Sequence, residues 1–220
     1  MTYNQLMKLQ FADKVLNQLI SEKASPFDIH SADFKNMFAG KRAYIVGKGG
    51  SYLKLNSNDF KDGIIITIND AIKHIETLQI DNLIISMQKD GSGTDCNKDS
   101  CGNCGFMSYP HNAYLLIHAL ESANCLPDYM VHKRLIFNNH NFGLEQIDFS
   151  AMSAIAICEW LGIADIVFYG FDSVNGDLDS YYPDGTIENS NFINYRLQIE
   201  RQLEYLKTKK INCEFKFKEG

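Results

Sequence analysis

The stretch AYIVGKGGSYLK, residues 43–54, is a short apolar run that ends in a cluster of glycines and a serine. An apolar run of this length, followed directly by glycines, is typical of a buried strand in a parallel sheet. The loop Gly47–Ser51 matches neither the dinucleotide-binding fingerprint nor the P-loop pattern. Its glycines would still let backbone N–H groups approach a phosphate, and Ser51 would add a hydroxyl donor. The loop is therefore either a phosphate site or a tight turn.

Strand-like and helix-like segments alternate along the chain. Apolar runs that indicate strands lie at residues 42–47, 63–69, 81–88, 129–138 and 164–172, and alternation at 211–217 indicates an edge strand. Helical patterns lie at 70–78, 150–162 and 191–210, and residues 150–162 have the composition of a buried helix that ends at Gly162. Strands separated by helices predict an α/β fold, a Rossmann-like and mostly parallel sheet with helices on both faces. We expect one domain over residues 1–220, with an N-terminal helical segment in 1–40 and an insert or lid in 91–147.

Polar residues follow each predicted strand. In parallel α/β sheets, ligands bind beyond the carboxyl ends of the strands, so these exits are where site residues are expected. The exits are Gly47–Ser51, Asn69-Asp70, Gln88-Lys89-Asp90, Asn138-Asn139-His140 and Asp172-Ser173. Loops are polar in most proteins, so the alternative is that these segments are ordinary surface loops.

Three stretches resemble a known family. VGKGGSYLK, ITINDAI and SAMSAIAICEWLGIADIVFYGFD are similar to the bacterial sialyltransferases of glycosyltransferase family 42 and to the related MptE-like proteins (6-hydroxymethylpterin diphosphokinase and its relatives). Both groups share a Gly-x-Gly-x-Ser-Leu loop after a strand, an Asn or Asp after the second strand, and a Ser-Gly-containing helix before a strand that ends in Gly-x-Asp. The resemblance covers about residues 40–90 and 148–217. It implies a Rossmann-like fold and a nucleotide ligand.

The resemblance also implies roles for individual residues. In the sialyltransferases, the glycine–serine loop and the asparagine after the second strand hold the cytidine nucleotide of the donor, and two tyrosines hold its phosphate. The residues implied in donor binding are Gly47, Gly49, Gly50, Ser51, Asn69 and Ser150, with Tyr181 or Tyr182 on the phosphate. Two positions depart from the family, because Ala151 replaces a glycine and Val174 replaces the first tyrosine.

The general base is the largest departure from the family. The sialyltransferases have a histidine shortly before their last helix, whereas no histidine of this chain lies in residues 185–196. Sugar transfer needs a proton acceptor within hydrogen-bond reach of the acceptor hydroxyl, and a carboxylate or another histidine can serve. The candidates are Asp172, Asp90 and His140, with Asp184 and Glu188 in the segment where the family has its histidine.

The predicted insert contains a possible metal site. Cys96, Cys101 and Cys104 have the spacing C-x4-C-x2-C, and His111 follows seven residues later. Two thiolates in Cys-Gly-x-Cys-Gly can bind zinc from one turn, and the metal would order a segment that has little to pack. We expect a structural zinc on these four residues, with Cys125 or His140 as other candidates for the fourth ligand. The alternative is a loop with free thiols.

Composition narrows the function classes. A net charge of −6 gives no reason to expect duplex nucleic acid as a partner, and no apolar run approaches the roughly 18 residues of a membrane span. Clustered cysteines in an otherwise cysteine-poor chain are typical of a reducing, cytoplasmic compartment. Residues 1–23 contain polar residues along their whole length, which does not fit a signal peptide. Their apolar residues recur at helical spacing and predict an amphipathic helix. The apolar positions assigned to its buried stripe are Leu6, Leu9, Phe11, Val15, Leu16, Leu19 and Ile20.

The combined pattern predicts an enzyme, a glycosyltransferase that uses a nucleotide-sugar donor of the CMP or UDP type. One alternative is a pterin-type diphosphokinase that uses Mg-ATP, in which Asp90 and Asp172 would bind Mg²⁺. Another is a non-catalytic nucleotide-binding module that has lost the base. The pattern indicates neither the acceptor nor the oligomeric state.

Overall fold

The computed structural model describes residues 1–22, 27–29, 34–88, 113–117, 134–136, 138–144, 150–189 and 193–218. Within these ranges the main sheet has eight strands in the order β1-β6-β5-β4-β3-β2-β7-β10, and each pairing is parallel. The strands are β1 (Phe27–Asp28), β2 (Arg42–Val46), β3 (Ile64–Ile68), β4 (Leu83–Gln88), β5 (Tyr114–Ile117), β6 (Arg134–Ile136), β7 (Asp165–Tyr169) and β10 (Asn212–Lys216). The predicted α/β, Rossmann-like fold is confirmed.

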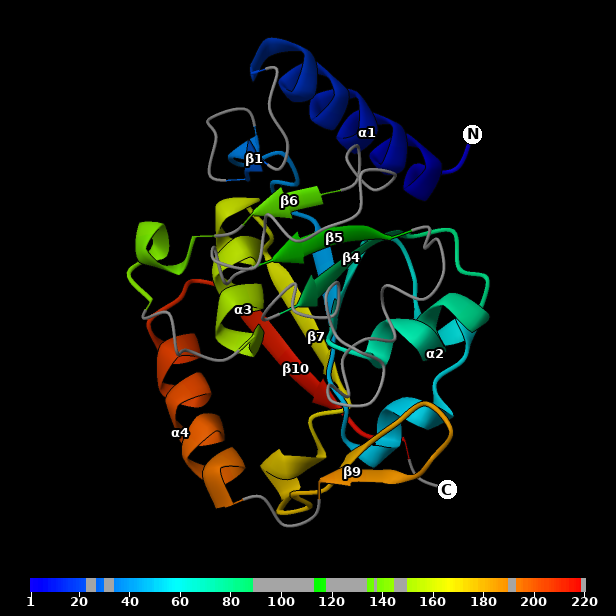
Figure 1. Ribbon diagram of the computed structural model, residues 1–220, viewed down its shortest axis with the longest axis vertical. Helices are drawn as coiled ribbons and strands as arrows, with labels where there is room; N and C mark the ends of the chain where they lie inside the picture. The colour runs from blue at the N-terminus through cyan, green and yellow to red at the C-terminus, as the bar shows by residue number, and fades with distance from the viewer. Residues whose placement is uncertain are drawn as a thin grey trace, which may run out of the picture.

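Four helices and a small hairpin accompany this sheet in the described ranges. The helices are α1 (Tyr3–Glu22), α2 (Ala71–Thr77), α3 (Ser150–Trp160) and α4 (Ile193–Lys207), and β8 (Ser180–Tyr181) pairs antiparallel with β9 (Ile187–Asn189). Helices α3 and α4 lie on one side of the sheet and α2 lies on the other (Figure 1). Figure 1 also shows β9 beyond the carboxyl ends of β7 and β10.

Both faces of the sheet are buried, which explains the continuous apolar runs. In β2, Ala43 and Ile45 belong to the core that α3 covers, whereas Tyr44 and Val46 belong to the core that α2 covers. This alternation follows the two-residue period of a strand. The strands predicted at 42–47, 63–69, 81–88, 164–172 and 211–217 are confirmed, and β10 is an edge strand as expected.

Two strands of the sheet fall in the segment predicted as an insert. β6 lies within the strand predicted at 129–138, and β5 was not predicted. The cysteine-containing part of the insert, residues 89–112, lies outside the described residues.

Helix α3 is the buried helix that the sequence predicts. Its residues Ser150 to Cys158 are all buried. Gly162 ends the helix at φ +78°, with hydrogen bonds from Gly162 N to Glu159 O and from Ile163 N to Cys158 O. This is a Schellman cap, in which the last carbonyls of the helix find partners.

The buried stripe of α1 matches the predicted one in part. Phe11 and Val15 pack into the core as predicted, together with Met7, whereas three of the predicted leucines, Leu6, Leu9 and Leu16, are exposed. Helical spacing allows more than one stripe, and the aromatic partners of Phe11, among them Phe34 and Phe38, select the observed one.

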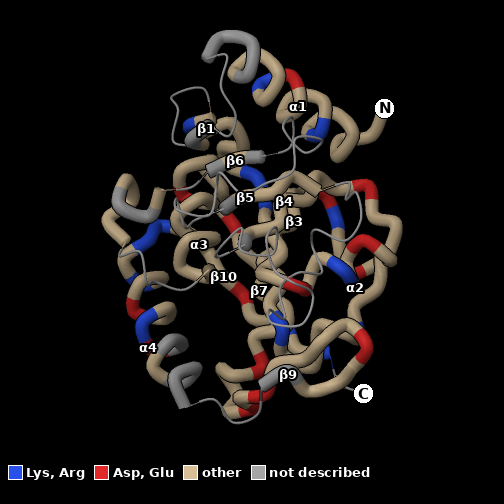
Figure 2. Tube along the Cα trace, viewed as in Figure 1, with Lys and Arg blue, Asp and Glu red and all other residues tan. Residues whose placement is uncertain are grey.

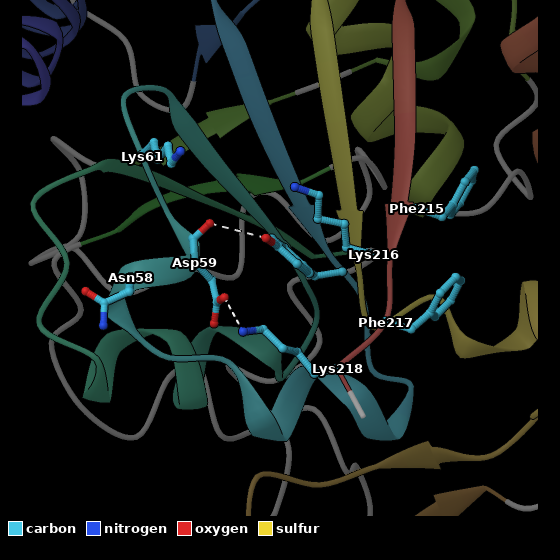
Figure 3. A pocket seen from close by; sticks show the side chains of 8 residues that line it. Asn58, Asp59, Lys61, Phe215, Lys216, Phe217 and Lys218 are labelled. Carbon is cyan, nitrogen blue, oxygen red and sulfur yellow. Dashed lines mark hydrogen bonds and ion pairs between the residues drawn. The ribbon is translucent and has the colours of Figure 1, made fainter. Parts of the chain in front are cut away.

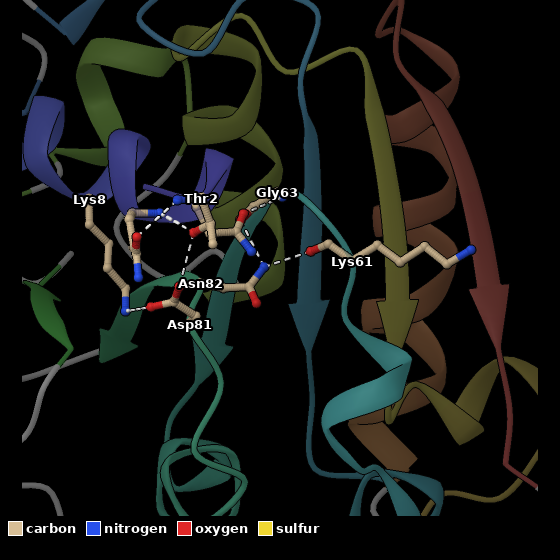
Figure 4. Close-up of polar contacts among 8 residues, drawn as sticks. Thr2, Lys8, Lys61, Gly63, Asp81 and Asn82 are labelled. Atoms are coloured by element: carbon tan, nitrogen blue, oxygen red, sulfur yellow. Dashed lines mark hydrogen bonds and ion pairs between the residues drawn. The ribbon is translucent and has the colours of Figure 1, made fainter.

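Polar contacts hold the start of α1 against the amino end of the sheet (Figure 4). Asp81 accepts hydrogen bonds from Thr2 Oγ1 at 3.1 Å and from Lys8 Nζ at 3.2 Å, and the bond from Lys8 is the main cause that lowers the pKa of Asp81. Next to it, buried Asn82 donates from Nδ2 to the carbonyl oxygens of Lys61 (2.8 Å) and Gly63 (3.0 Å). Asn82 therefore ties the turn before β3 to the start of β4.

Replacing Asn82 by alanine is expected to lower the free energy of unfolding by about 1–3 kcal/mol, because two carbonyl groups lose their donor in a buried position. Urea denaturation followed by circular dichroism measures the change. Asn58→Ala is the control, since the Asn58 side chain is exposed. An equal loss in both variants would contradict the assigned role.

Candidate functional site

The order of the strands places a ligand site between β2 and β7. From β2 the chain adds β3, β4, β5 and β6 on one side, and then returns to add β7 and β10 on the other. In open parallel sheets, ligands bind at this reversal, outside the carboxyl ends of the strands. The loops that follow β2 and β7 are Gly47–Ser51 and Gly170–Asp172, so the strand order and the residue pattern indicate the same place.

The two loops lie directly against each other. Gly47 N donates to Tyr169 O and Gly49 N donates to Gly170 O, each at 2.8 Å. A Cβ atom on Gly47 would lie 2.6 Å from Gly170 O, which is closer than real Cβ contacts allow. The backbone approach therefore requires glycine at this crossing.

The Asp172 side chain lies where a side chain on Gly49 would otherwise project. Its Oδ2 accepts hydrogen bonds from Ser51 Oγ at 2.8 Å and from Ser51 N at 3.2 Å. A Cβ atom on Gly49 would lie 2.3 Å from the same oxygen. The sequence predicted that the backbone N–H groups of the loop and the Ser51 hydroxyl bind a phosphate. In the structure, the N–H and the hydroxyl of Ser51 bind the Asp172 carboxylate instead.

The β8–β9 hairpin closes over this loop. Tyr181 N donates to Lys48 O at 2.9 Å, and Tyr52 OH donates to Tyr181 O at 3.2 Å. The Tyr181 ring lies over Gly50, at 3.2 Å from the place of a Cβ atom there. Burial, and then the carboxylates of Asp177, Asp179 and Asp172, raise the pKa of Tyr181. The Tyr181 phenol can donate a hydrogen bond. Figure 2 shows acidic residues gathered near β9.

A buried ion-pair cluster lies under the same hairpin. Lys48 Nζ is 3.7 Å from Asp70 Oδ2, and Lys73 Nζ is 3.7 Å from Asp70 Oδ1. The Asp70 side chain is fully buried, and Lys48 is almost so. Lys48 Nζ also lies 5.3 Å from the centre of the Tyr182 ring. No role was predicted for Asp70 or Lys73. Their only signal in the sequence was the position of Asp70 at a strand exit and of Lys73 one helical turn later.

The other predicted donor-binding residues are positioned by neighbouring elements. Asn69 precedes Asp70 in the turn after β3, at φ +50°, and its N–H donates to Met87 O at 3.0 Å. Ser150 is buried at the start of α3. Because α3 leads straight into the amino end of β7, the start of α3 lies towards the carboxyl edge of the sheet (Figure 1). Of the predicted residues, Gly47, Gly49, Gly50, Ser51, Asp172 and Tyr181 are joined by direct contacts.

Several predicted residues cannot be placed. Asp90, Cys96, Cys101, Cys104 and His111 lie outside the described residues. His140 belongs to the short 3-10 helix η8 (Asn139–Phe142), and its side chain lies outside the description. Within the described ranges no group of three or more His, Cys, Asp or Glu side chains could hold a metal ion, so neither zinc nor magnesium is assigned. A membrane-crossing helix is not found among the described residues.

A pocket of about 460 Å³ is lined by residues from the ends of β7 and β10 and from the segment 58–61 (Figure 3). Asp59, which lines it, forms an ion pair with Lys218, and its carbonyl oxygen accepts a hydrogen bond from Tyr169 OH at 3.2 Å. Burial, assisted by Asp59, raises the pKa of Tyr169 to about 12. A second pocket, of about 560 Å³, includes residues of α1 and the start of β4. Neither pocket is lined by Ser51 or Asp172.

Comparison with known proteins gives a distant likeness. No family model and no curated protein matches the chain. Among solved structures, the chain is similar to the sialyltransferase CST-II in complex with a trisaccharide acceptor and CMP, with 13% identity, a TM-score of 0.45 and 80% of each chain covered. It is also similar to the sialyltransferase CstII from Campylobacter jejuni in complex with the substrate analogue CMP-3FNeuAc, with 14% identity, a TM-score of 0.43, and 80% of this chain and 79% of that chain covered. At these identities the likeness concerns the fold.

Proposed function

We propose that the protein is a glycosyltransferase that takes a sugar from a nucleotide-activated donor, and that the donor binds at the carboxyl ends of β2, β3 and β7. The observation that carries the proposal is the contact between the glycine loop after β2 and Asp172 after β7, at the point where the strand order reverses. The sequence resemblance to the family 42 sialyltransferases favours a CMP-type donor. The acceptor is a separate question.

The residues at this point suit the chemistry of sugar transfer. The acceptor hydroxyl attacks the anomeric carbon, the bond from that carbon to the phosphate oxygen breaks, and the nucleotide leaves with the electron pair. A base takes the proton of the hydroxyl. Asp172 is the proposed base, because Ser51 holds one of its oxygens and fixes the carboxylate. Tyr181 is the proposed donor to the phosphate, since its ring lies over Gly50 of the glycine loop and a phenol can donate a hydrogen bond.

Isothermal titration calorimetry with CMP, UDP, GDP and ATP, each with and without Mg²⁺, tests the proposal. CMP is expected to bind without metal, whereas strict dependence on Mg-ATP would instead indicate the diphosphokinase. Absence of binding by all four nucleotides would contradict both enzyme functions. A panel of activated sugars, with products identified by mass, then tests transfer itself, and release of CMP is the expected result.

A further inference from the structure

The cluster Lys48–Asp70–Lys73 has an excess of positive charge in an acidic protein. Each oxygen of the buried Asp70 carboxylate faces one ammonium group at 3.7 Å. One carboxylate between two ammonium groups leaves a local charge of +1, whereas the formal net charge of the chain is −6. Within these three groups, positive charge therefore exceeds negative charge by one, which favours an anion that reaches both ammonium groups.

Contacts of Lys48 connect the cluster to the glycine loop and to the β8–β9 hairpin. Lys48 is part of the glycine loop, its carbonyl oxygen accepts the hydrogen bond from Tyr181 N, and its ammonium lies against the Tyr182 ring. Lys73 is joined to Lys48 through Asp70, and its charge is the smallest of the contributions to the lowered pKa of Asp184, where the hydrogen bonds from Thr186 are the main cause. Lys48 thus belongs to the site directly, and Lys73 belongs to it through Asp70.

Burial makes these two charges different from surface lysines. The Lys48 side chain is 8% exposed and that of Lys73 is 27% exposed. An ammonium group in such surroundings interacts with an anion more strongly than one in water, because the effective dielectric constant is lower. Burying it is costly unless a counter-charge is present, and Asp70 supplies that charge for both lysines.

We infer that Lys48 and Lys73 bind the phosphate of the nucleotide donor, and that Asp70 is the counter-charge that offsets part of their positive charge in the free protein. This inference rests on the proposed function and names the groups that serve it. The bond to the anomeric carbon breaks with its electron pair going to the phosphate oxygen, and the two lysines stabilise the charge that develops there.

The test measures the affinities of CMP, cytidine and inorganic pyrophosphate by calorimetry at low salt. Lys48→Gln and Lys73→Gln are each expected to weaken CMP and pyrophosphate binding about tenfold, which corresponds to about 1.4 kcal/mol, and to leave cytidine unchanged. Lys73→Gln keeps the buried Lys48–Asp70 pair, so it remains informative if Lys48→Gln does not fold. Lys54→Gln is the control, because Lys54 is an exposed lysine of the same segment.

Asp70→Asn separates binding from a merely structural ion pair. If the lysines bind phosphate, removing the carboxylate between them raises pyrophosphate affinity or leaves it within about twofold of wild type. An ion pair that only supports the fold would be lost equally in Asp70→Asn and Lys48→Gln, so an equal loss of pyrophosphate affinity in both would overturn the inference.

The outcomes also separate this inference from the proposed function. CMP binding that neither lysine variant weakens overturns the inference and leaves the function standing. Pyrophosphate binding that depends on Lys48 and Lys73, in a protein that binds no nucleotide, supports the anion site and overturns the function. Failure of the wild-type protein to bind either CMP or pyrophosphate overturns both.

Discussion

Replacing Gly170 by alanine is expected to lower the free energy of unfolding by about 3 kcal/mol or more, and to remove nucleotide binding together with the fold around the site. Gly170 has φ +68°, and a Cβ atom there would lie 2.6 Å from Gly47 O and 2.8 Å from Tyr52 Cβ. Two penalties therefore add: a left-handed backbone conformation for a residue with a side chain, and a collision with the backbone of the glycine loop. Urea denaturation measures the sum.

Gly40→Ala separates the two penalties. Gly40 has nearly the same φ, +71°, and a Cβ atom there would meet nothing within 4 Å. This variant has the conformational penalty alone, which we expect to be about 1–2 kcal/mol. If both variants lose the same stability, the close approach of the loops after β2 and β7 contributes nothing, and the packing described for the site is wrong.

The fold was predictable from the sequence because burial on both faces leaves a strong signal. β2, β3, β4 and β7 are continuous apolar runs with polar residues directly after them, and these two features define both the sheet and its ligand-binding edge. β5 was not predicted, because its four apolar residues, Tyr114–Ile117, do not distinguish a short buried strand from part of a helix. The stripe of α1 was predicted only in part, because the pattern of one helix does not say which face meets a partner.

The loops that form the site could be predicted from the sequence, whereas the residue pairs within it could not. The pairing of Ser51 with Asp172 joins residues 121 positions apart, and no local pattern shows that a carboxylate rather than a phosphate meets the Ser51 donors. The same holds for Lys48 and Asp70, which come from the exits of different strands. Exits of parallel strands indicate where site residues gather, whereas hydrogen bonds and charge pairing between them depend on the packing of the loops.

Asp172→Asn is expected to lower the rate of donor cleavage by about 10²–10⁴, the usual contribution of a general base, and to change CMP affinity by no more than a few-fold. The amide oxygen of asparagine can still accept the hydrogen bonds from Ser51, so the loop keeps its shape and only the capacity to take a proton is lost. The rate is measured as release of CMP from the activated sugar that the panel identifies, with water as the acceptor. Asp177→Asn is the control, since Asp177 follows Asp172 in the same segment, is exposed, and accepts a local hydrogen bond from Asp179 N.

Ser51→Ala tests whether the hydrogen bond from Ser51 Oγ to Asp172 contributes to the reaction. Removing the hydroxyl leaves the carboxylate with the backbone donor at 3.2 Å, so we expect a partial loss of rate, about tenfold. CMP affinity is the second readout. A serine that only orients Asp172 lowers the rate and leaves CMP affinity unchanged, whereas a serine that only supports the fold of the loop lowers both. A wild-type rate in Asp172→Asn would exclude Asp172 as the base and turn the search to Asp90 and His140.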